Sequence, residues 1–245
     1  MDHPRSPKPL SNQGAGRSGR LARWLDLVLP PHCVLCARAA PPTLLCDACL
    51  SRLPQAAPGC PVCGIEHGEA GWCGRCLGRT PAFDRTIACF RYAPPLDRLI
   101  QSLKYGHDLA IAQALGTCMA AVMPPLAVDL IVPVPLHRAR LAERGFNQSV
   151  ELARPVARAL GRPIVHEATR RRRQTQAQAG LSLAGRRRNL TGAFEARRRF
   201  DDLHVLVVDD VMTSGATLEA FARCLKRAGA AQVSNLVCAR TPTGR

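Results

Sequence analysis

The chain has 245 residues, enough for one large domain or two small ones. Its 34 Lys and Arg residues outnumber 18 Asp and Glu residues, and the resulting net charge of +16 favours an anionic partner. No stretch approaches the roughly 18 consecutive apolar residues of a membrane span, so the sequence predicts no transmembrane segment.

The first 30 residues contain two kinds of sequence. Residues 1–19 are rich in Pro, Ser, Gly and Arg, a composition that predicts a disordered tail. Leu21, Trp24, Leu25 and Val28 follow at helical spacing and predict a short helix docked on the domain. No small-residue cleavage site follows this segment, so it does not make a signal peptide, and we expect a cytoplasmic protein.

Eight of the twelve cysteines form a tandem repeat of four Cys-x-x-Cys knuckles, which predicts a small zinc module over residues 20–80. Two knuckles can complete a tetrahedral shell of four thiolates, so four knuckles predict two structural Zn²⁺ ions. In a reducing compartment metal is favoured over disulfides. Sequential pairing of the knuckles is the simplest arrangement, and a cross-braced arrangement would exchange the middle pairs. The expected ligands are Cys33, Cys36, Cys46, Cys49, Cys60, Cys63, Cys73 and Cys76.

From residue 83 onward the hydrophobic pattern alternates between strands and helices. The predicted helices cover residues 96–104, 109–123, 147–160 and 217–228. The predicted strands cover residues 86–92, 129–134, 163–168, 204–208 and 233–239. This alternation predicts an α/β domain over residues 83–245 with a mostly parallel, doubly wound sheet. Such sheets bind ligands beyond the carboxyl ends of their strands.

The most informative stretch is VLVVDDVMTSGATL, residues 205–218. It reads as a buried strand, a tight loop of small and hydroxylic residues, and the start of a helix. The backbone N–H groups of such a loop can surround an anion at the helix N-terminus. Asp209 and Asp210, at the end of the strand, suit sugar hydroxyls or Mg²⁺. Together they predict a sugar phosphate site, and no Lys follows the glycine as in a nucleotide-binding P-loop.

This stretch resembles the signature of type I phosphoribosyltransferases, which bind 5-phosphoribosyl-1-pyrophosphate (PRPP). The only departure is Ser214 in place of a Thr, and it keeps the hydroxyl. The resemblance implies that Asp209 and Asp210 face the ribose and are the catalytic residues, with Mg²⁺ bridging pyrophosphate and ribose oxygens. It also implies that the ribose 5-phosphate is held by Thr213, Ser214, Gly215, Ala216 and Thr217.

Three further segments complete a family pattern: Lys104-Tyr105-Gly106, PVPLHRARLAERGFNQS at residues 133–149, and an Arg-rich run at residues 170–194. With the cysteine knuckles in front and the PRPP signature behind, this order resembles the ComF family of bacterial competence-associated, phosphoribosyltransferase-like proteins over about residues 24–240. The resemblance implies a role in DNA uptake, with PRPP, single-stranded DNA and proteins of the competence machinery as partners.

By the same resemblance, residues 133–138 match the loop that receives pyrophosphate, where His137 and Arg138 would contact the anion. Lys104 is a further expected PRPP contact. The segment 145–148 begins the next helix, with Asn147 as a cap, or contacts the ligand. Only 28 residues follow the signature, so no C-terminal hood over the sugar is visible. We therefore hypothesise that the zinc module takes the place of the hood.

The positive charge is concentrated between His137 and Phe200, which hold 16 arginines and four acids, a net charge of +12. The run from residue 170 to 189 resembles a mobile loop that closes over pyrophosphate, and an ordinary solvated basic loop is the alternative. The run offers no aromatic platform, so DNA binding would be independent of base sequence. The expected DNA contacts are Arg170, Arg171, Arg172, Arg173, Arg186, Arg187 and Arg188.

Two functions from different classes follow from these features. The first is a DNA-handling protein that keeps a PRPP-binding core, which the basic block and the family resemblance favour. The second is an active phosphoribosyltransferase with an unidentified acceptor, which the intact signature favours. The sequence favours the first.

Overall fold

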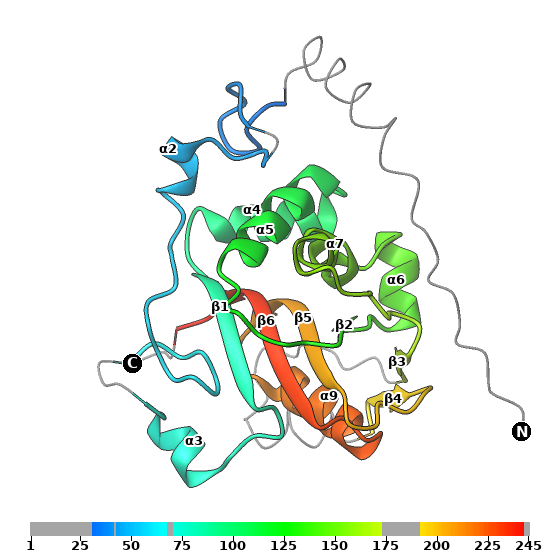
Figure 1. Cartoon of the computed structure of the whole chain (residues 1–245). Helices are drawn as coiled ribbons and strands as arrows, with labels where there is room; N and C mark the ends of the chain where they lie inside the picture. Colours follow the sequence, from blue (N-terminus) through cyan, green and yellow to red (C-terminus); the bar gives the residue numbers. More distant parts are fainter. Residues whose placement is uncertain (1–30, 42, 68–70, 173–191, 243–245) are drawn as a thin grey trace, which may run out of the picture.

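The computed structural model describes residues 31–41, 43–67, 71–172 and 192–242. At its centre lies a four-stranded parallel sheet in the order β1-β6-β5-β2 (Figure 1). The strands are β1 (Arg85–Arg91), β6 (Gln232–Arg240), β5 (His204–Met212) and β2 (Leu130–Pro133). The sheet confirms the predicted parallel architecture. The predicted tail and N-terminal helix lie outside the described residues.

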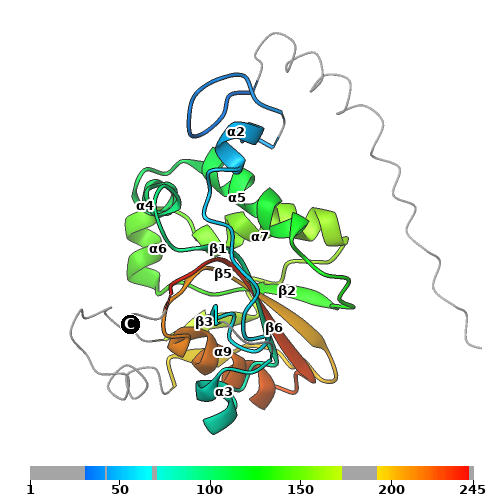
Figure 2. The same ribbon diagram turned by 90° about the vertical axis from the view of Figure 1, so that its left-hand side faces the viewer.

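Helices cover both faces of the sheet (Figures 1 and 2). One face carries α4 (Leu96–Tyr105), α5 (Leu109–Ala121) and α7 (Gln148–Leu160). The other carries α9 (Ala216–Arg227) and a small antiparallel sheet of β3 (Thr169–Arg171) and β4 (Phe194–Ala196). The helix α6 (Arg138–Arg144) connects β2 to α7. None of the helices in the described ranges is long and apolar enough to cross a membrane.

The residues of β5 show why this layering forms. Val205 and Val207 belong to the hydrophobic cluster that contains α9, whereas Leu206 and Val208 belong to the cluster under α4, α5 and α7. Side chains alternate between the two faces of a strand, so an uninterrupted apolar run supplies both cores. The central position of β5 is therefore a direct consequence of its sequence.

The zinc module is divided between the two faces of the sheet. Its first part contains α2 (Asp47–Leu50) and shares a hydrophobic cluster with α4 and α5, whereas its second part contains α3 (Gly74–Gly78) and shares a cluster with α9 (Figure 2). The chain between them runs along the outer edge of β1, where Arg91 N–H donates to Pro54 O at 2.7 Å and Thr86 N–H donates to Pro61 O at 3.1 Å. The module thereby covers an otherwise open sheet edge.

Two predicted strands differ from the structure. Residues 163–168 do not form a strand, since only Ile164 pairs with the sheet, in an isolated bridge to Ile131. The chain then leaves the sheet edge to enter β3, on the face that carries α9. The strand predicted at residues 204–208 is longer, because β5 continues through both acids to Met212 while it pairs with β6. The pairing with β6 holds the acids in a rigid backbone.

Candidate functional site

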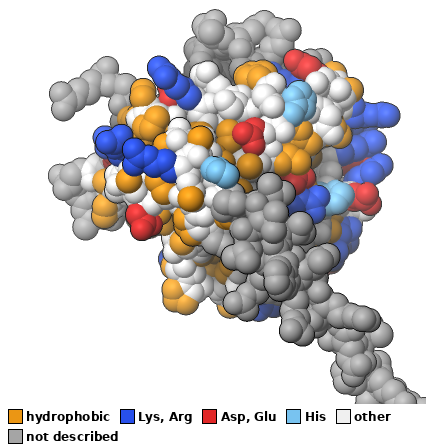
Figure 3. All heavy atoms as spheres, turned by 90° about the horizontal axis from the view of Figure 1, so that it is seen from above, with side chains coloured by type: hydrophobic (Ala, Val, Ile, Leu, Met, Phe, Trp, Pro, Cys, Tyr) orange, Lys and Arg blue, Asp and Glu red, His pale blue; other side chains and the backbone are white. Residues whose placement is uncertain are grey.

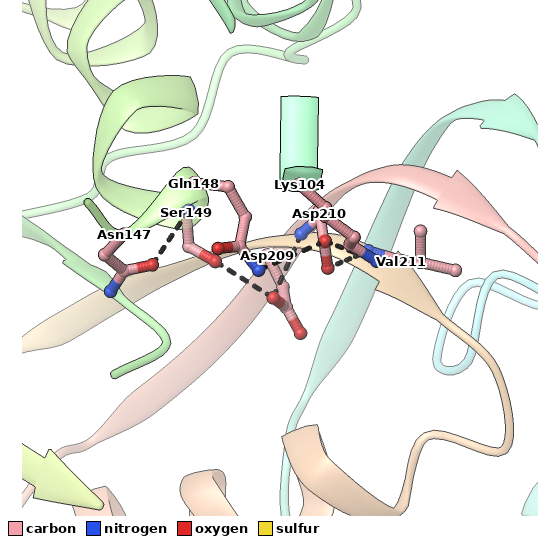
Figure 4. Close-up of polar contacts among 7 residues, drawn as sticks. All are labelled: Lys104, Asn147, Gln148, Ser149, Asp209, Asp210 and Val211. Carbon is pink, nitrogen blue, oxygen red and sulfur yellow. Dashed lines mark hydrogen bonds and ion pairs between the residues drawn. The ribbon is translucent and has the colours of Figure 1, made fainter. Parts of the chain in front are cut away.

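Asp209 and Asp210 lie near the carboxyl end of β5, and their exposed fractions are only 8% and 6%. Asp209 Oδ1 accepts a hydrogen bond from Ser149 Oγ at 3.0 Å. Asp210 Oδ2 accepts one from Gln148 Nε2 at 3.4 Å and lies 2.7 Å from Lys104 Nζ. Figure 4 shows these side chains converging from the end of α4, the start of α7 and β5. Residues far apart in sequence therefore form one polar cluster.

The cluster holds a carboxyl group that titrates near neutral pH. Burial raises the pKa of Asp209 to about 7, and the charge of Asp210 adds to the rise. Hydrogen bonds from the Asp210 N–H and from Ser149, together with the charge of Lys104, act in the opposite direction. Burial lowers the pKa of Lys104, but the nearby Asp210 outweighs it, so the net shift is upward. A divalent cation bound here would favour the ionised form of Asp209.

The expected phosphate loop connects β5 directly to α9. Gly215 is the N-cap of α9 and has a left-handed backbone with φ of +78°. A side chain at this position would be strained by the left-handed backbone, and its Cβ atom, 2.7 Å from Met212 Cε, would require the end of Met212 to shift. Ser214 Oγ accepts a hydrogen bond from Ala216 N–H at 3.4 Å. The loop thus stands at the N-terminus of a 12-residue helix, where backbone N–H groups and the helix dipole favour an anion.

The expected pyrophosphate loop follows β2, the strand next to β5. Val134 N–H donates to Val208 O at 2.9 Å, which ties this loop to the strand that carries the acids. His137 is the N-cap of α6, where its Nδ1 accepts a hydrogen bond from Ala139 N–H at 3.3 Å, and Arg138 is exposed at the first position of the helix. No hydrogen bond or ion pair joins either residue to Asp209 or Asp210 among the described residues.

Asn147 joins the pyrophosphate loop to α7. Its Oδ1 accepts from Ser149 N–H at 3.0 Å as a helix cap, and its Nδ2 donates to Val134 O at 3.0 Å. Of the two interpretations of this residue, the structure shows the cap. Gln148 was expected at the helix start or at the ligand and Ser149 only within the helix, and the contacts of both residues with the acids were missed. A polar pair directly after an Asn cap was the available signal.

A second missed residue is Arg240, at the end of β6, with an exposed fraction of 4%. Its Nε donates to Cys63 O at 3.0 Å, while its Nη1 donates to Met212 O at 3.0 Å and also to Thr213 O. One buried guanidinium therefore joins a zinc knuckle to the phosphate loop. Nothing in the local sequence pattern singles out this arginine, because the three partners that join the knuckle to the loop lie 27 to 177 residues away.

The second part of the zinc module makes further contacts with this loop. Arg75 Nη1 donates to Ser214 O at 3.1 Å, and just after the module Ala82 N–H donates to Glu219 Oε2, in the first turn of α9, at 2.7 Å. Arg75 and Arg79 also line a pocket whose far wall is Ser214 to Ala216. The module therefore borders the loop, and the hypothesis that it takes the place of a hood stays a prediction.

The eight knuckle cysteines form two groups, and within each group the four sulfur atoms lie within 4.8 Å of one another. One group holds Cys33, Cys36, Cys46 and Cys49, and the other holds Cys60, Cys63, Cys73 and Cys76. Four convergent thiols at this spacing suit tetrahedral Zn²⁺. The sequential pairing is therefore confirmed, and the cross-braced alternative is wrong.

The arginines expected to bind DNA are only partly described. Arg170 and Arg172 both pair with Glu195 of β4, at 2.7 and 3.3 Å. The Arg171 guanidinium lies over the ring of Phe194 at 5.4 Å from its centroid. Arg173, Arg186, Arg187 and Arg188 lie outside the described residues. The antiparallel pairing of β3 with β4 thus places Glu195 beside Arg170 and Arg172 and partly neutralises their charges.

Other basic side chains gather elsewhere. In Figure 3 they crowd the right-hand edge of the face that is seen from above, the side on which α6 lies in Figure 1. Two exposed or partly exposed arginines belong to α6 and two to α7, whereas Arg144 at the end of α6 is buried. The four are Arg138, Arg140, Arg154 and Arg158. The described part of the chain therefore offers a second basic surface, beside the expected pyrophosphate loop.

Comparisons with known proteins match both parts of the chain. The double zinc ribbon domain matches residues 24–100, and the phosphoribosyl transferase domain matches residues 147–245. The DNA utilization protein YhgH of Salmonella typhi is 37% identical over 225 residues, which cover 88% of this chain and 99% of that protein. The chain belongs to the ComF family.

More distant relatives agree with this assignment. Competence protein F of Haemophilus influenzae is 31% identical over 77% of this chain and 87% of its own. Competence protein ComFC of Bacillus subtilis is 26% identical over 82% of this chain and 86% of its own. Membership of the ComF family confirms the combination expected from the sequence, a double zinc ribbon joined to a type I phosphoribosyltransferase fold.

Proposed function

We propose that this ComF protein acts in DNA uptake as a cytoplasmic DNA-handling protein that binds PRPP with Mg²⁺ and also binds single-stranded DNA. The names of its relatives, which refer to competence and DNA utilization, support the role in DNA uptake. Other proteins of the competence machinery are proposed partners.

The observation that carries PRPP binding is the pairing of two buried acids with an anion loop on one strand–helix connection. Asp209 and Asp210 offer carboxylate oxygens for ribose hydroxyls or for Mg²⁺, and the N-terminus of α9 offers backbone N–H groups to a phosphate. Mg²⁺ would supply charge neutralisation of pyrophosphate. Lys104 and Ser149 hold the acids in place, which supports a preorganised site.

The test of PRPP binding is a double substitution, Asp209→Asn with Asp210→Asn. It should weaken PRPP–Mg²⁺ binding by about 2–4 kcal/mol, because two hydrogen bonds to charged groups are lost. Calorimetry measures the affinity. Asp202→Asn is the matched control, since Asp202 is exposed and outside the cluster. Equal affinity of the double variant and the control would mean that the signature no longer binds PRPP in this chain.

Single-stranded DNA binding is proposed on the density of positive charge, and its salt dependence tests it. If about four phosphates are neutralised, log K should fall with log salt at a slope near −3, at ~0.7 per phosphate for single strands. Replacing Arg170 to Arg173 with Ala should flatten this slope, whereas Arg223→Ala, on α9, should leave it unchanged. An unchanged slope in the fourfold variant would move the DNA site to the basic surface beside α6 or to the zinc module.

An active phosphoribosyltransferase is the second candidate, and the complete loop geometry at Gly215 favours it. Transfer would form a bond between ribose C1 and the nucleophilic atom of the acceptor while the bond from C1 to the pyrophosphate oxygen breaks and pyrophosphate leaves with the electron pair. Catalysis would consist mainly of positioning and charge stabilisation. Release of pyrophosphate in the presence of candidate acceptors would distinguish turnover from binding alone.

A further inference from the structure

Tyr105 presents an exposed aromatic ring at the end of α4, next in the chain to the lysine of the acidic cluster. It is the last residue of α4, with an exposed fraction of 67%, and it directly follows Lys104, whose Nζ lies 2.7 Å from Asp210 Oδ2. Among the described aromatic residues Trp72, at 45%, is the other largely exposed ring, whereas five phenylalanines are buried. These buried rings are Phe83, Phe90, Phe194, Phe200 and Phe221.

Arg144 lies against the ring of Tyr105 and fixes its position. The guanidinium carbon is 5.2 Å from the ring centroid, and the exposed fraction of Arg144 is only 7%. Within the described ranges its buried Nε has no hydrogen-bond partner. An arginine in such a place is costly unless the contact with the ring or a ligand compensates it. Arg144 is also the last residue of α6, which begins at the expected pyrophosphate loop.

A second aromatic contact joins the same two segments. The rings of His107 and Phe146 are 5.8 Å apart between centroids and tilted by 58°. His107 follows Tyr105 by two residues, and Phe146 follows Arg144 by two. Two contacts therefore join the end of α4 to the turn between α6 and α7. One face of the Tyr105 ring packs on Arg144, and much of the side chain is exposed to solvent.

We propose that Tyr105 is a stacking platform for a nucleobase, supported from behind by Arg144, at the edge of the PRPP site. The proposal rests on the proposed function, because it names the chemistry of the second ligand. Every base has a π-face, so stacking would be tolerant of base identity. The base could belong to single-stranded DNA or to a free acceptor, and both sources share this planar heteroaromatic chemistry. Tyr105 would supply the aromatic platform that the Arg-rich run lacks.

The test compares an oligodeoxythymidylate with an oligonucleotide of equal length whose sites are abasic, at one salt concentration. Tyr105→Ala should weaken binding of the normal oligonucleotide by about 5- to 100-fold. It should leave binding of the abasic strand and the salt slope unchanged, since no phosphate contact is lost. Tyr105→Phe should bind as the wild type does, and Trp72→Ala, which removes the exposed ring of the zinc module, is the matched control.

A second arm measures binding of free adenine, guanine and uracil by equilibrium dialysis with PRPP and Mg²⁺ present. If Tyr105→Ala loses only the binding of free bases, the stacked base belongs to an acceptor. If it loses only affinity for the normal oligonucleotide, the stacked base belongs to DNA. Equal loss for normal and abasic strands, or no loss in either arm, would overturn the proposal. If the stacking proposal fails but the protein binds PRPP, the proposed function stands. If Tyr105 stacks on bases but the protein does not bind PRPP, only the proposal of PRPP binding is refuted.

Discussion

Loss of zinc from the second cysteine group should reduce PRPP affinity more than tenfold, whereas loss from the first group should leave it almost unchanged. Each wild-type chain should carry two Zn²⁺ ions, and Cys63→Ser and Cys36→Ser should each lower the content to one. The parallel sheet should remain folded in both variants, because most residues of both hydrophobic clusters come from strands and helices outside the zinc module.

The asymmetry follows from where each group is packed. The first group shares a cluster with α4 and α5, on the face opposite α9. The second group lies against the phosphate loop, where Arg240 joins Cys63 O to Met212 O and Arg75 holds Ser214 O. Zinc ligation supplies most of the folding free energy of such small modules, so release of the second ion frees Cys63 O and Arg75 together. The loop would then lose two of its supports.

Elemental analysis gives the zinc content, and calorimetry with PRPP and Mg²⁺ gives the affinity. Arg240→Met tests the contact between the zinc knuckle and the phosphate loop separately from the metal. This variant should keep both zinc ions but bind PRPP more weakly than the wild type does. Arg223→Ala, on the exposed side of α9, is the control for a lost arginine. Equal PRPP affinity in Cys36→Ser and Cys63→Ser, or unimpaired binding in Arg240→Met, would contradict the expected coupling.

Substitution of Lys104 by Met should destabilise the protein by about 2–3 kcal/mol at pH 8.5 and by much less at pH 6. Removing one partner of a buried ion pair costs about 3–5 kcal/mol, and we expect less here because the Lys104 side chain keeps an exposed fraction of 23%. The variant leaves Asp209 and Asp210 side by side without a cation. At lower pH these carboxyl groups can take up a proton instead.

The direction of the pH dependence follows from Asp209. Its pKa in the folded protein is raised to about 7, above the value of about 3.9 in an unfolded chain. The folded state therefore binds the proton more tightly, and this contribution to stability is complete below pH ~4 and is lost as the pH rises through 7. Without Lys104 the pKa should rise further, so the loss extends to higher pH.

Urea unfolding of the zinc-loaded protein at pH 6 and pH 8.5 measures both effects, and this range avoids acid release of zinc. Lys104→Arg, which keeps the charge, should recover most of the stability. Arg98→Met is the matched control, because Arg98 is an exposed cation on the same helix. A penalty in Lys104→Met that is equal at both pH values would show that the lysine acts through packing rather than through charge.

Features that depend on neighbours in the chain could be predicted from the amino-acid sequence alone. A Cys-x-x-Cys knuckle forms within four residues, so the number of zinc sites could be counted directly. The strand, loop and helix around Asp209 to Thr217 are contiguous, so this strand–loop–helix connection, on which the proposed anion site rests, was predictable as one unit. The parallel sheet followed from the alternation of apolar strands and amphipathic helices.

Contacts between residues far apart in the chain could be seen only in the folded structure. Ser149 reaches Asp209 across 60 positions, Arg240 reaches Cys63 across 177, and Tyr105 meets Arg144 through two different helices. The pairing of the zinc knuckles and the contacts of Glu195 with the arginines of β3 also became visible only there. Such contacts depend on strand order, register and helix packing, which are properties of the whole fold and leave no periodic trace in the local sequence.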